Sequence, residues 1–223
     1  LIRASLPQLL EATQLTVIVS FAAFALAIVV GLIFAAARRS HVLPVRGFAF
    51  IYVNLFRGAA LYVLVIWLFN GLAVATGLLL SAITVGVLAL TLLNSAYLTE
   101  VFRSSIDAVD RGQWEAAQAI GLSRWDVFHR VIAPQAARVA IPATGNHLID
   151  ALKDSAILAV IAVPELMFVS NRIANSTFRP FEMYVSAAAI YLVIVYTVAL
   201  ALRWLERRLE IERRVPVGGI LPR

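Results

Sequence analysis

Three charged residues stand within one otherwise apolar segment, 146-NHLIDALKDSAIL-158. In a helix, Asp150 can reach Lys153 three residues later and lies on the same stripe as Asp154, with His147 one turn earlier. An ionised group at the centre of a helix in lipid costs about 2.5–3.5 kcal/mol, so these side chains require a partner or a water-filled cavity. They could line a path for a ligand that carries an ammonium and a carboxylate. They could equally form an internal ion cluster that ties the segment to a neighbouring subunit.

Polar residues in two other apolar segments could contribute to the same path. Arg57 begins one of these segments and could instead be an interfacial arginine whose charge reaches water. Asn94 and Tyr97 lie one turn apart in the next segment, where hydrogen bonds between helices would explain them equally well. The chain has no cysteine and three scattered histidines. We therefore predict neither a metal site nor a catalytic cluster.

A second informative stretch is charged and rich in helix formers: 113-QWEAAQAIGLSRWDVFHR-130. Asp110 and Gln113 have the spacing of a capping box, which favours a helix that starts there. Gly121 supplies the left-handed residue that commonly ends a helix. The small residues after Glu115 leave a narrow surface with a single carboxylate, which suits a groove in another protein.

Ser123 and Asp126 have the spacing of a second capping box and open another helix, which we expect to run to about Ala133 before Pro134. The stretch is therefore predicted to be two short helices joined at a glycine corner. The alternative is a helix pair that lies on the membrane surface. Such a pair would show bulky apolar residues with a basic fringe.

The composition indicates what surrounds these residues. The 223-residue chain is 61% hydrophobic and 14% charged, with a mean hydropathy of +0.88. Uncharged runs of about 20 residues can cross a bilayer as helices, and lipid offers no partner for an open backbone. We therefore predict an all-α integral membrane protein, with a hydrophilic loop at 170–182 before its last span. One transmembrane domain covers 1–223, with five spans at about 13–37, 58–75, 79–98, 141–163 and 183–202.

Arginine and lysine residues set the expected orientation, because they are enriched on the cytoplasmic side of membrane proteins. Thirteen of them fall on one side of the predicted spans and three on the other. The N-terminus is therefore expected outside, with the C-terminus and the loop at about 103–138 in the cytoplasm. The net charge of +6 follows from this asymmetry. It does not indicate a nucleic-acid partner, since the basic residues form no continuous stripe.

The residues 115-EAA-117, Gly121, Val131 and Pro134 resemble the Glu-Ala-Ala loop of bacterial ABC importer permeases. The family pattern is EAA, three residues, Gly, nine residues, Ile, one residue and Leu-Pro. This chain matches that spacing, with Val131 for Ile and Ala133 for Leu. The wider context resembles the polar amino acid branch of the family, the histidine, glutamine and opine type. The matching stretches are 100-EVFRSSIDAVDRGQWEAAQAIGL-122, 134-PQAARVAIP-142 and 153-KD-154.

The resemblance implies that the loop is a coupling helix, which docks on a cytoplasmic ATPase and moves when ATP closes the ATPase dimer. Glu115 would be the anchoring carboxylate and Gly121 would allow close packing at the corner. Ala116, Ala117 and Leu122 complete the implied contact. The chain has no Gly-rich phosphate loop. The resemblance thus implies a transport subunit rather than an enzyme, with no cofactor of its own and with ATP and Mg²⁺ on the partner ATPase.

The implied location is the bacterial cytoplasmic (inner) membrane, with lipid around the spans. The implied partners are a second permease, identical or paralogous, two ABC ATPase subunits and an extracytoplasmic solute-binding protein. The implied cargo is a polar amino acid or a related zwitterionic solute. Opines and compatible solutes such as ectoine are alternatives. An ion-coupled carrier is a further alternative that leaves the loop unexplained.

The candidate residues of the substrate path are Arg57, Asn94, Tyr97, Asp150, Lys153 and Asp154. The family's Lys-Asp-Thr-Ser-Leu stretch matches here at Lys153 and Asp154, whereas Ser155 and Ala156 replace its Thr and Ser. Leu64 stands where permeases of the family tend to carry a glutamine. This subunit therefore either holds the solute itself or completes a channel beside a paralogue that holds it.

Overall fold

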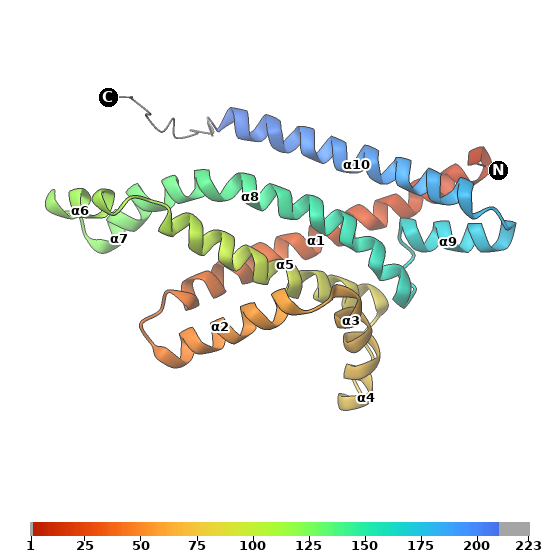
Figure 1. Cartoon of the computed structure of the whole chain (residues 1–223), viewed down its shortest axis with the longest axis horizontal. Helices are drawn as coiled ribbons and strands as arrows, with labels where there is room; N and C mark the ends of the chain where they lie inside the picture. The colour runs from red at the N-terminus through yellow and green to blue at the C-terminus, as the bar shows by residue number, and fades with distance from the viewer. Residues whose placement is uncertain (1, 210–223) are drawn as a thin grey trace, which may run out of the picture.

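The computed structural model describes residues 2–209, and the regular elements within that range are all helical. The all-α prediction is therefore confirmed for the described residues. Four long helices run along the long axis of the molecule (Figure 1): α1 (Ile2–Arg38), α5 (Ala82–Asp107), α8 (Ala133–Asp154) and α10 (Pro180–Arg208). A shorter helix, α2 (Leu43–Gly58), packs against α1 and α5.

Within residues 2–209, between three and five segments are able to cross a membrane. Three single helices are long and apolar enough, namely Ser5–Arg38, Ala82–Asp107 and Pro180–Arg208. Two bent helix pairs raise the number to five if each pair is one span. The start of α1 and the end of α10 lie at opposite ends of the bundle (Figure 1), which is the arrangement that an odd number of crossings produces.

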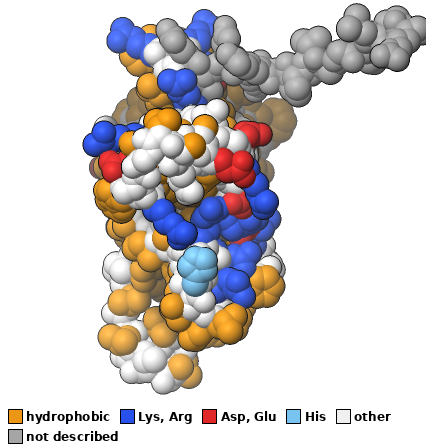
Figure 2. All heavy atoms as spheres, turned by 90° about the vertical axis from the view of Figure 1, so that its left-hand side faces the viewer, with side chains coloured by type: hydrophobic (Ala, Val, Ile, Leu, Met, Phe, Trp, Pro, Cys, Tyr) orange, Lys and Arg blue, Asp and Glu red, His pale blue; other side chains and the backbone are white. Residues whose placement is uncertain are grey.

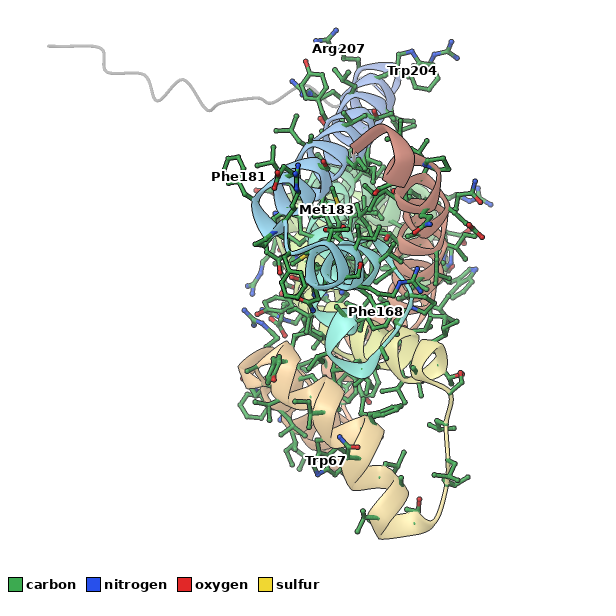
Figure 3. All side chains as sticks on the ribbon, turned by 90° about the vertical axis from the view of Figure 1, so that its right-hand side faces the viewer. Trp67, Phe168, Phe181, Met183, Trp204 and Arg207 are labelled. Carbon is green, nitrogen blue, oxygen red and sulfur yellow. The ribbon has the colours of Figure 1, made fainter. Side chains whose placement is uncertain are left out.

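The second predicted span has different boundaries in the structure. α2 ends at Gly58, Ala59 and Ala60 are extended, and the chain bends by 106°. The part after the bend turns away from the bundle and leaves Trp67 exposed (Figure 3). The span expected at 58–75 thus coincides with only the second half of a bent pair. After the bend come α3 (Leu61–Ile66), a π-helical turn (Trp67–Gly71) and α4 (Leu72–Thr76).

The helix expected to stop before Pro134 continues instead, so that prediction is wrong. α7 (Arg124–Asp126) leads into a π-helical turn (Val127–Ile132), which runs directly into α8. A 3-10 segment (Ser155–Ile161) then extends α8 at its other end. The wide turn accommodates the proline, a residue that has no amide hydrogen to donate.

A helix also replaces most of the loop expected at 170–182, and that prediction is wrong as well. α9 (Leu166–Thr177) begins at Glu165, whose carboxylate accepts hydrogen bonds from the amides of Met167 at 2.8 Å and Phe168 at 2.7 Å. The same buried carboxylate accepts a 2.9 Å hydrogen bond from the hydroxyl of Tyr191 on α10. A capped and bonded start therefore stabilises a helix in a stretch that is hydrophilic by composition.

α5 is the centre of the bundle and packs against α1, α2 and α8. Small residues let α1 and α5 approach closely: a Cβ added to Gly31 would lie 3.0 Å from the Cβ of Leu98. The hydroxyls of Thr91 and Thr99 donate across this contact to the carbonyls of Ala23 at 3.2 Å and Gly31 at 3.4 Å. Such contacts are typical of helices that associate in lipid. They fix the position of α5 against α1, and α5 carries side chains of the site described next.

Candidate transport path and coupling site

The first helix of the charged loop, α6 (Arg111–Ala119), begins at Asp110. The Asp110 carboxylate accepts a 2.6 Å hydrogen bond from the amide of Gly112, not from that of Gln113. The Gln113 side chain instead accepts a 3.4 Å hydrogen bond from Gln135 at the start of α8. The predicted cap is therefore confirmed, whereas the reciprocal box between Asp110 and Gln113 is wrong.

Gly121 follows the end of this helix with a φ of +85°, in the left-handed region. A Cβ added there would meet nothing within 4 Å, so the position needs glycine for its backbone conformation and not for packing within the chain. The hydroxyl of Ser123 then accepts a 3.2 Å hydrogen bond from the amide of Asp126 and donates a 2.5 Å hydrogen bond to its carboxylate. The predicted glycine corner between two capped helices is confirmed.

The five residues of the implied ATPase contact fall into two groups, one packed within the chain and one exposed. Ala117 is buried in the hydrophobic cluster that holds the corner to the start of α8, and Leu122 packs against that cluster. Glu115, Ala116 and Gly121 are exposed. The first pair therefore connects the corner to the rest of the chain, and the other three are accessible to a partner.

Two large hydrophobic side chains at the corner are also exposed, Ile120 at 78% and Trp125 at 71%. Neither residue was predicted from the sequence, although a bulky apolar residue beside a helix-ending glycine is a signal that the sequence contains. Figure 2 looks onto this end of the molecule, where Lys and Arg side chains gather. Exposed aromatic and aliphatic side chains among basic residues mark a surface that another protein or the membrane covers.

A second set of polar residues comes together on one lateral face of α2, α5 and α8. The guanidinium of Arg57 lies over the ring of Tyr97, 5.3 Å from its centroid. The hydroxyl of Tyr97 donates a 3.4 Å hydrogen bond to the carbonyl of Arg57. The ring of His147 stacks on that of Tyr97 with 5.5 Å between centroids. His147 was recognised in the sequence only as a neighbour of Asp150, and its i,i+3 spacing is the signal that places it on this face.

The charged pair on α8 belongs to the same face. Nζ of Lys153 lies 2.8 Å from Oδ1 of Asp150, and the two side chains are 55% and 50% exposed. Asp154 is half-buried beside them. An exposed ion pair on the flank of an apolar helix bundle requires water or a second protein against it.

Asn94 does not join this face. Its side chain is buried, and its Nδ2 donates a 2.8 Å hydrogen bond to the carbonyl of Leu90 within α5. Of the six predicted path residues, the structure therefore brings five to one face and leaves Asn94 in the interior. Within residues 2–209, no group of three or more His, Cys, Asp or Glu side chains could hold a metal ion.

A bundle of apolar helices with a charged lateral face and an exposed, capped corner defines a class: a membrane transport subunit that works with other chains. The chain belongs to the family described as "Binding-protein-dependent transport system inner membrane component", whose sequence model matches residues 27–211. It is a transport permease subunit and not an enzyme. The resemblance based on the Glu-Ala-Ala stretch is thereby confirmed.

Individual relatives agree with this assignment. The chain is 37% identical over 212 residues to the octopine transport system permease OccQ of Rhizobium meliloti, covering 90% of this chain and 89% of that protein. It is 31% identical over 208 residues to the glutamine transport system permease GlnP of Escherichia coli, covering 93% and 95%. Its structure is similar to the crystal structure of an amino acid ABC transporter with histidines. That match has a TM-score of 0.88 and 36% identity, over 93% of this chain and 96% of that one.

Proposed function

We propose that this chain forms the translocation path for a polar amino acid or a related zwitterionic solute. It does so in an ATP-driven, binding-protein-dependent importer of a bacterial inner membrane. The observation that carries the proposal is the charged lateral face, where the Asp150–Lys153 pair lies near the stack of Arg57, Tyr97 and His147. The names of similar permeases, for glutamine and octopine, support the class of solute.

A second permease, a copy or a paralogue, closes the path against this face. In the single chain about half of the Asp150 and Lys153 side chains is exposed. Lipid against them would leave each charge poorly solvated, at a cost of about 2.5–3.5 kcal/mol. A facing subunit with a water-filled gap removes that cost and makes room for a solute.

The face offers both charges that a zwitterion needs. Asp150 and Asp154 supply carboxylates for an ammonium group. Lys153 and Arg57 supply cations for a carboxylate, and the planar guanidinium of Arg57 suits two parallel hydrogen bonds. An opine, which carries more than one carboxylate, is the second candidate solute, and the octopine permease among the relatives favours it.

The exposed corner couples this path to ATP hydrolysis. Ile120 and Trp125 enter an apolar groove on the ATPase, and Glu115 anchors the contact through its charge. The cluster around Ala117 passes the motion to α8, because it includes Ala136 in the first turn of α8. Two ATPase subunits bind the ATP and Mg²⁺. The corner lies in the cytoplasm, and the solute-binding protein delivers its cargo at the opposite end, near α9 (Figure 1).

Asp154→Asn tests the role of the charged face. We expect the variant to assemble normally with its partners, since the Asp150–Lys153 pair is left intact, and to lose about tenfold or more of amino acid uptake, because a hydrogen bond to a charged group contributes about 1.5–3 kcal/mol. Uptake is measured in proteoliposomes that hold the permease, the ATPase and the binding protein. Glu206→Gln near the end of α10 is the matched control, since it removes a partly exposed carboxylate on a helix that forms no part of this face. Loss of assembly in the Asp154 variant would favour a structural ion cluster instead.

A further inference from the structure

A small pocket lies at the corner where α1 ends and α2 begins. It has a volume of about 260 Å³ and is lined by Arg38, Leu43, Arg46, Gly47 and Phe50. Two guanidinium groups and three apolar residues thus share one recess. Nothing in the charged lateral face or in the coupling corner uses these side chains.

Positive charge is in excess around this pocket. Nη2 of Arg38 pairs with Glu100 at 3.2 Å, and Arg103 pairs with both Glu100 at 2.7 Å and Asp107 at 2.8 Å. Asp107 also pairs with Arg39. Two carboxylates of α5 are therefore shared among three arginines. Among the described residues, the fourth arginine of the corner, Arg46, forms no ion pair.

Two contacts of Arg38 within the chain fix one side of the pocket. The guanidinium of Arg38 lies over the ring of Phe50, 4.9 Å from its centroid, and its ion pair with Glu100 fixes it from the other side. Gly47 lines the pocket and has no side chain, and a Cβ added there would meet nothing within 4 Å. The recess is therefore open at Gly47 and bounded by one fixed cation.

An exposed apolar surface leads away from the pocket along α2. Leu43 and Phe50 border the recess and are themselves exposed, and Ile51 and Leu55 continue the surface over the next turns. Figure 2 shows basic and hydrophobic side chains next to each other on this end of the molecule. A ligand that matches the whole feature has an anionic head and apolar chains. A free phosphate would match the arginines but leave the apolar border exposed.

We propose that this pocket binds the headgroup of an anionic phospholipid from the cytoplasmic leaflet, with its acyl chains against α2. The phosphate lies between Arg38 and Arg46, and Leu43 and Phe50 contact the start of the chains. Basic pockets beside membrane helices on the cytoplasmic side recognise anionic headgroups in this way. The lipid adds negative charge where three arginines share two carboxylates, so it relieves the surplus positive charge next to the end of α5.

The test is lipid binding to the purified complex of permease and ATPase, measured by native mass spectrometry with phosphatidylglycerol or phosphatidylcholine. We expect phosphatidylglycerol to bind more tightly. Arg46→Gln is expected to weaken its binding by about fivefold, since one arginine near an anionic surface contributes about 1 kcal/mol. Gly47→Leu fills the recess without changing any charge, and it is expected to weaken phosphatidylglycerol binding at least as much.

Arg207→Gln is the matched control. It removes one positive charge from an exposed position near the end of α10, on the side of the molecule away from α2 (Figure 3), and is expected to leave binding unchanged. Equal binding of the two lipids would overturn the proposal. So would equal losses in the Arg46 and Arg207 variants, which would indicate diffuse attraction, or displacement of the lipid by millimolar inorganic phosphate, which would indicate a soluble anion.

Discussion

The guanidinium of Arg57 lies 5.3 Å from the centroid of the Tyr97 ring, and this contact joins α2 to α5. His147 stacks on the same ring and adds α8. One aromatic ring therefore connects the three helices that carry the charged lateral face. A cation over an aromatic ring gains about 0.5–1 kcal/mol at an exposed site and about 2 kcal/mol when it is desolvated. The stack holds the guanidinium in place while its edge stays available to a ligand.

Two substitutions of Arg57 distinguish the role of its positive charge from that of its stacked guanidinium group. Arg57→Gln is expected to reduce uptake by about tenfold or more, because a hydrogen bond to a charged group contributes about 1.5–3 kcal/mol. Arg57→Lys keeps the charge and should retain an intermediate rate. The measurement is KM and maximal uptake rate in proteoliposomes. Arg203→Gln is the control, since Arg203 also lies over an aromatic ring, that of Tyr196, on α10. An equal loss in that control would remove the special role of Arg57.

The Asp150–Lys153 pair can be tested with a double-mutant cycle. If the pair only stabilises α8, Asp150→Asn and Lys153→Gln should each impair the protein and the double variant should recover, because no unpaired charge remains. If both side chains bind solute, the double variant should be at least as impaired as either single one. We expect the second result. Uptake and complex assembly are measured for all four forms, and recovery of uptake in the double variant would contradict the proposed role.

Gly121 should be required for its backbone conformation alone. Its φ of +85° makes Gly121→Ala unfavourable by about 1–2 kcal/mol, whereas Gly121→Asn should be tolerated better, since asparagine visits the left-handed region more readily. A Cβ added at this position would meet nothing within 4 Å, so steric contact does not contribute to the cost. We expect thermal unfolding of the purified permease to show the highest stability with glycine at position 121, a lower one with asparagine and the lowest with alanine. A variant with alanine as stable as the parent would show that the corner adopts another conformation.

Glu165 is predicted to be a stabilising residue of the fold. Its buried carboxylate accepts hydrogen bonds from two backbone amides and from Tyr191. Glu165→Ala leaves these donors unpaired and should cost about 1–3 kcal/mol. Tyr191→Phe removes only one donor and should cost less. Thermal unfolding in detergent ranks the two variants, and the reverse order would contradict the assigned contacts.

The local chemistry of the loop could be predicted from the sequence because each signal acts within a few residues. Gly121 and Ser123 adopt the expected roles, since a left-handed residue and a hydroxyl cap depend on their neighbours alone. The charged face was largely predictable for a related reason: an ionised group in an apolar helix must find a partner. Asp150 and Lys153 met that requirement with each other.

The remaining features depend on the three-dimensional arrangement of the chain, which local sequence patterns do not report. The 106° bend between α2 and α3 is a change of backbone direction, which a hydropathy average does not report. Asn94 is buried and bonded within α5, and spacing alone could not separate it from Tyr97. The start of α9 is also held by a hydrogen bond between Glu165 and Tyr191, which are far apart in the sequence.

The most direct test of the central claim is ATP-dependent uptake of a labelled amino acid panel into proteoliposomes that contain the permease, its ATPase and its binding protein. It compares the parent protein with Glu115→Lys, a charge reversal at the exposed corner. We predict that uptake of polar amino acids requires ATP and the binding protein, and that the variant loses uptake while the complex still assembles. Uptake that persists without the ATPase would contradict the account and identify an ion-coupled carrier instead.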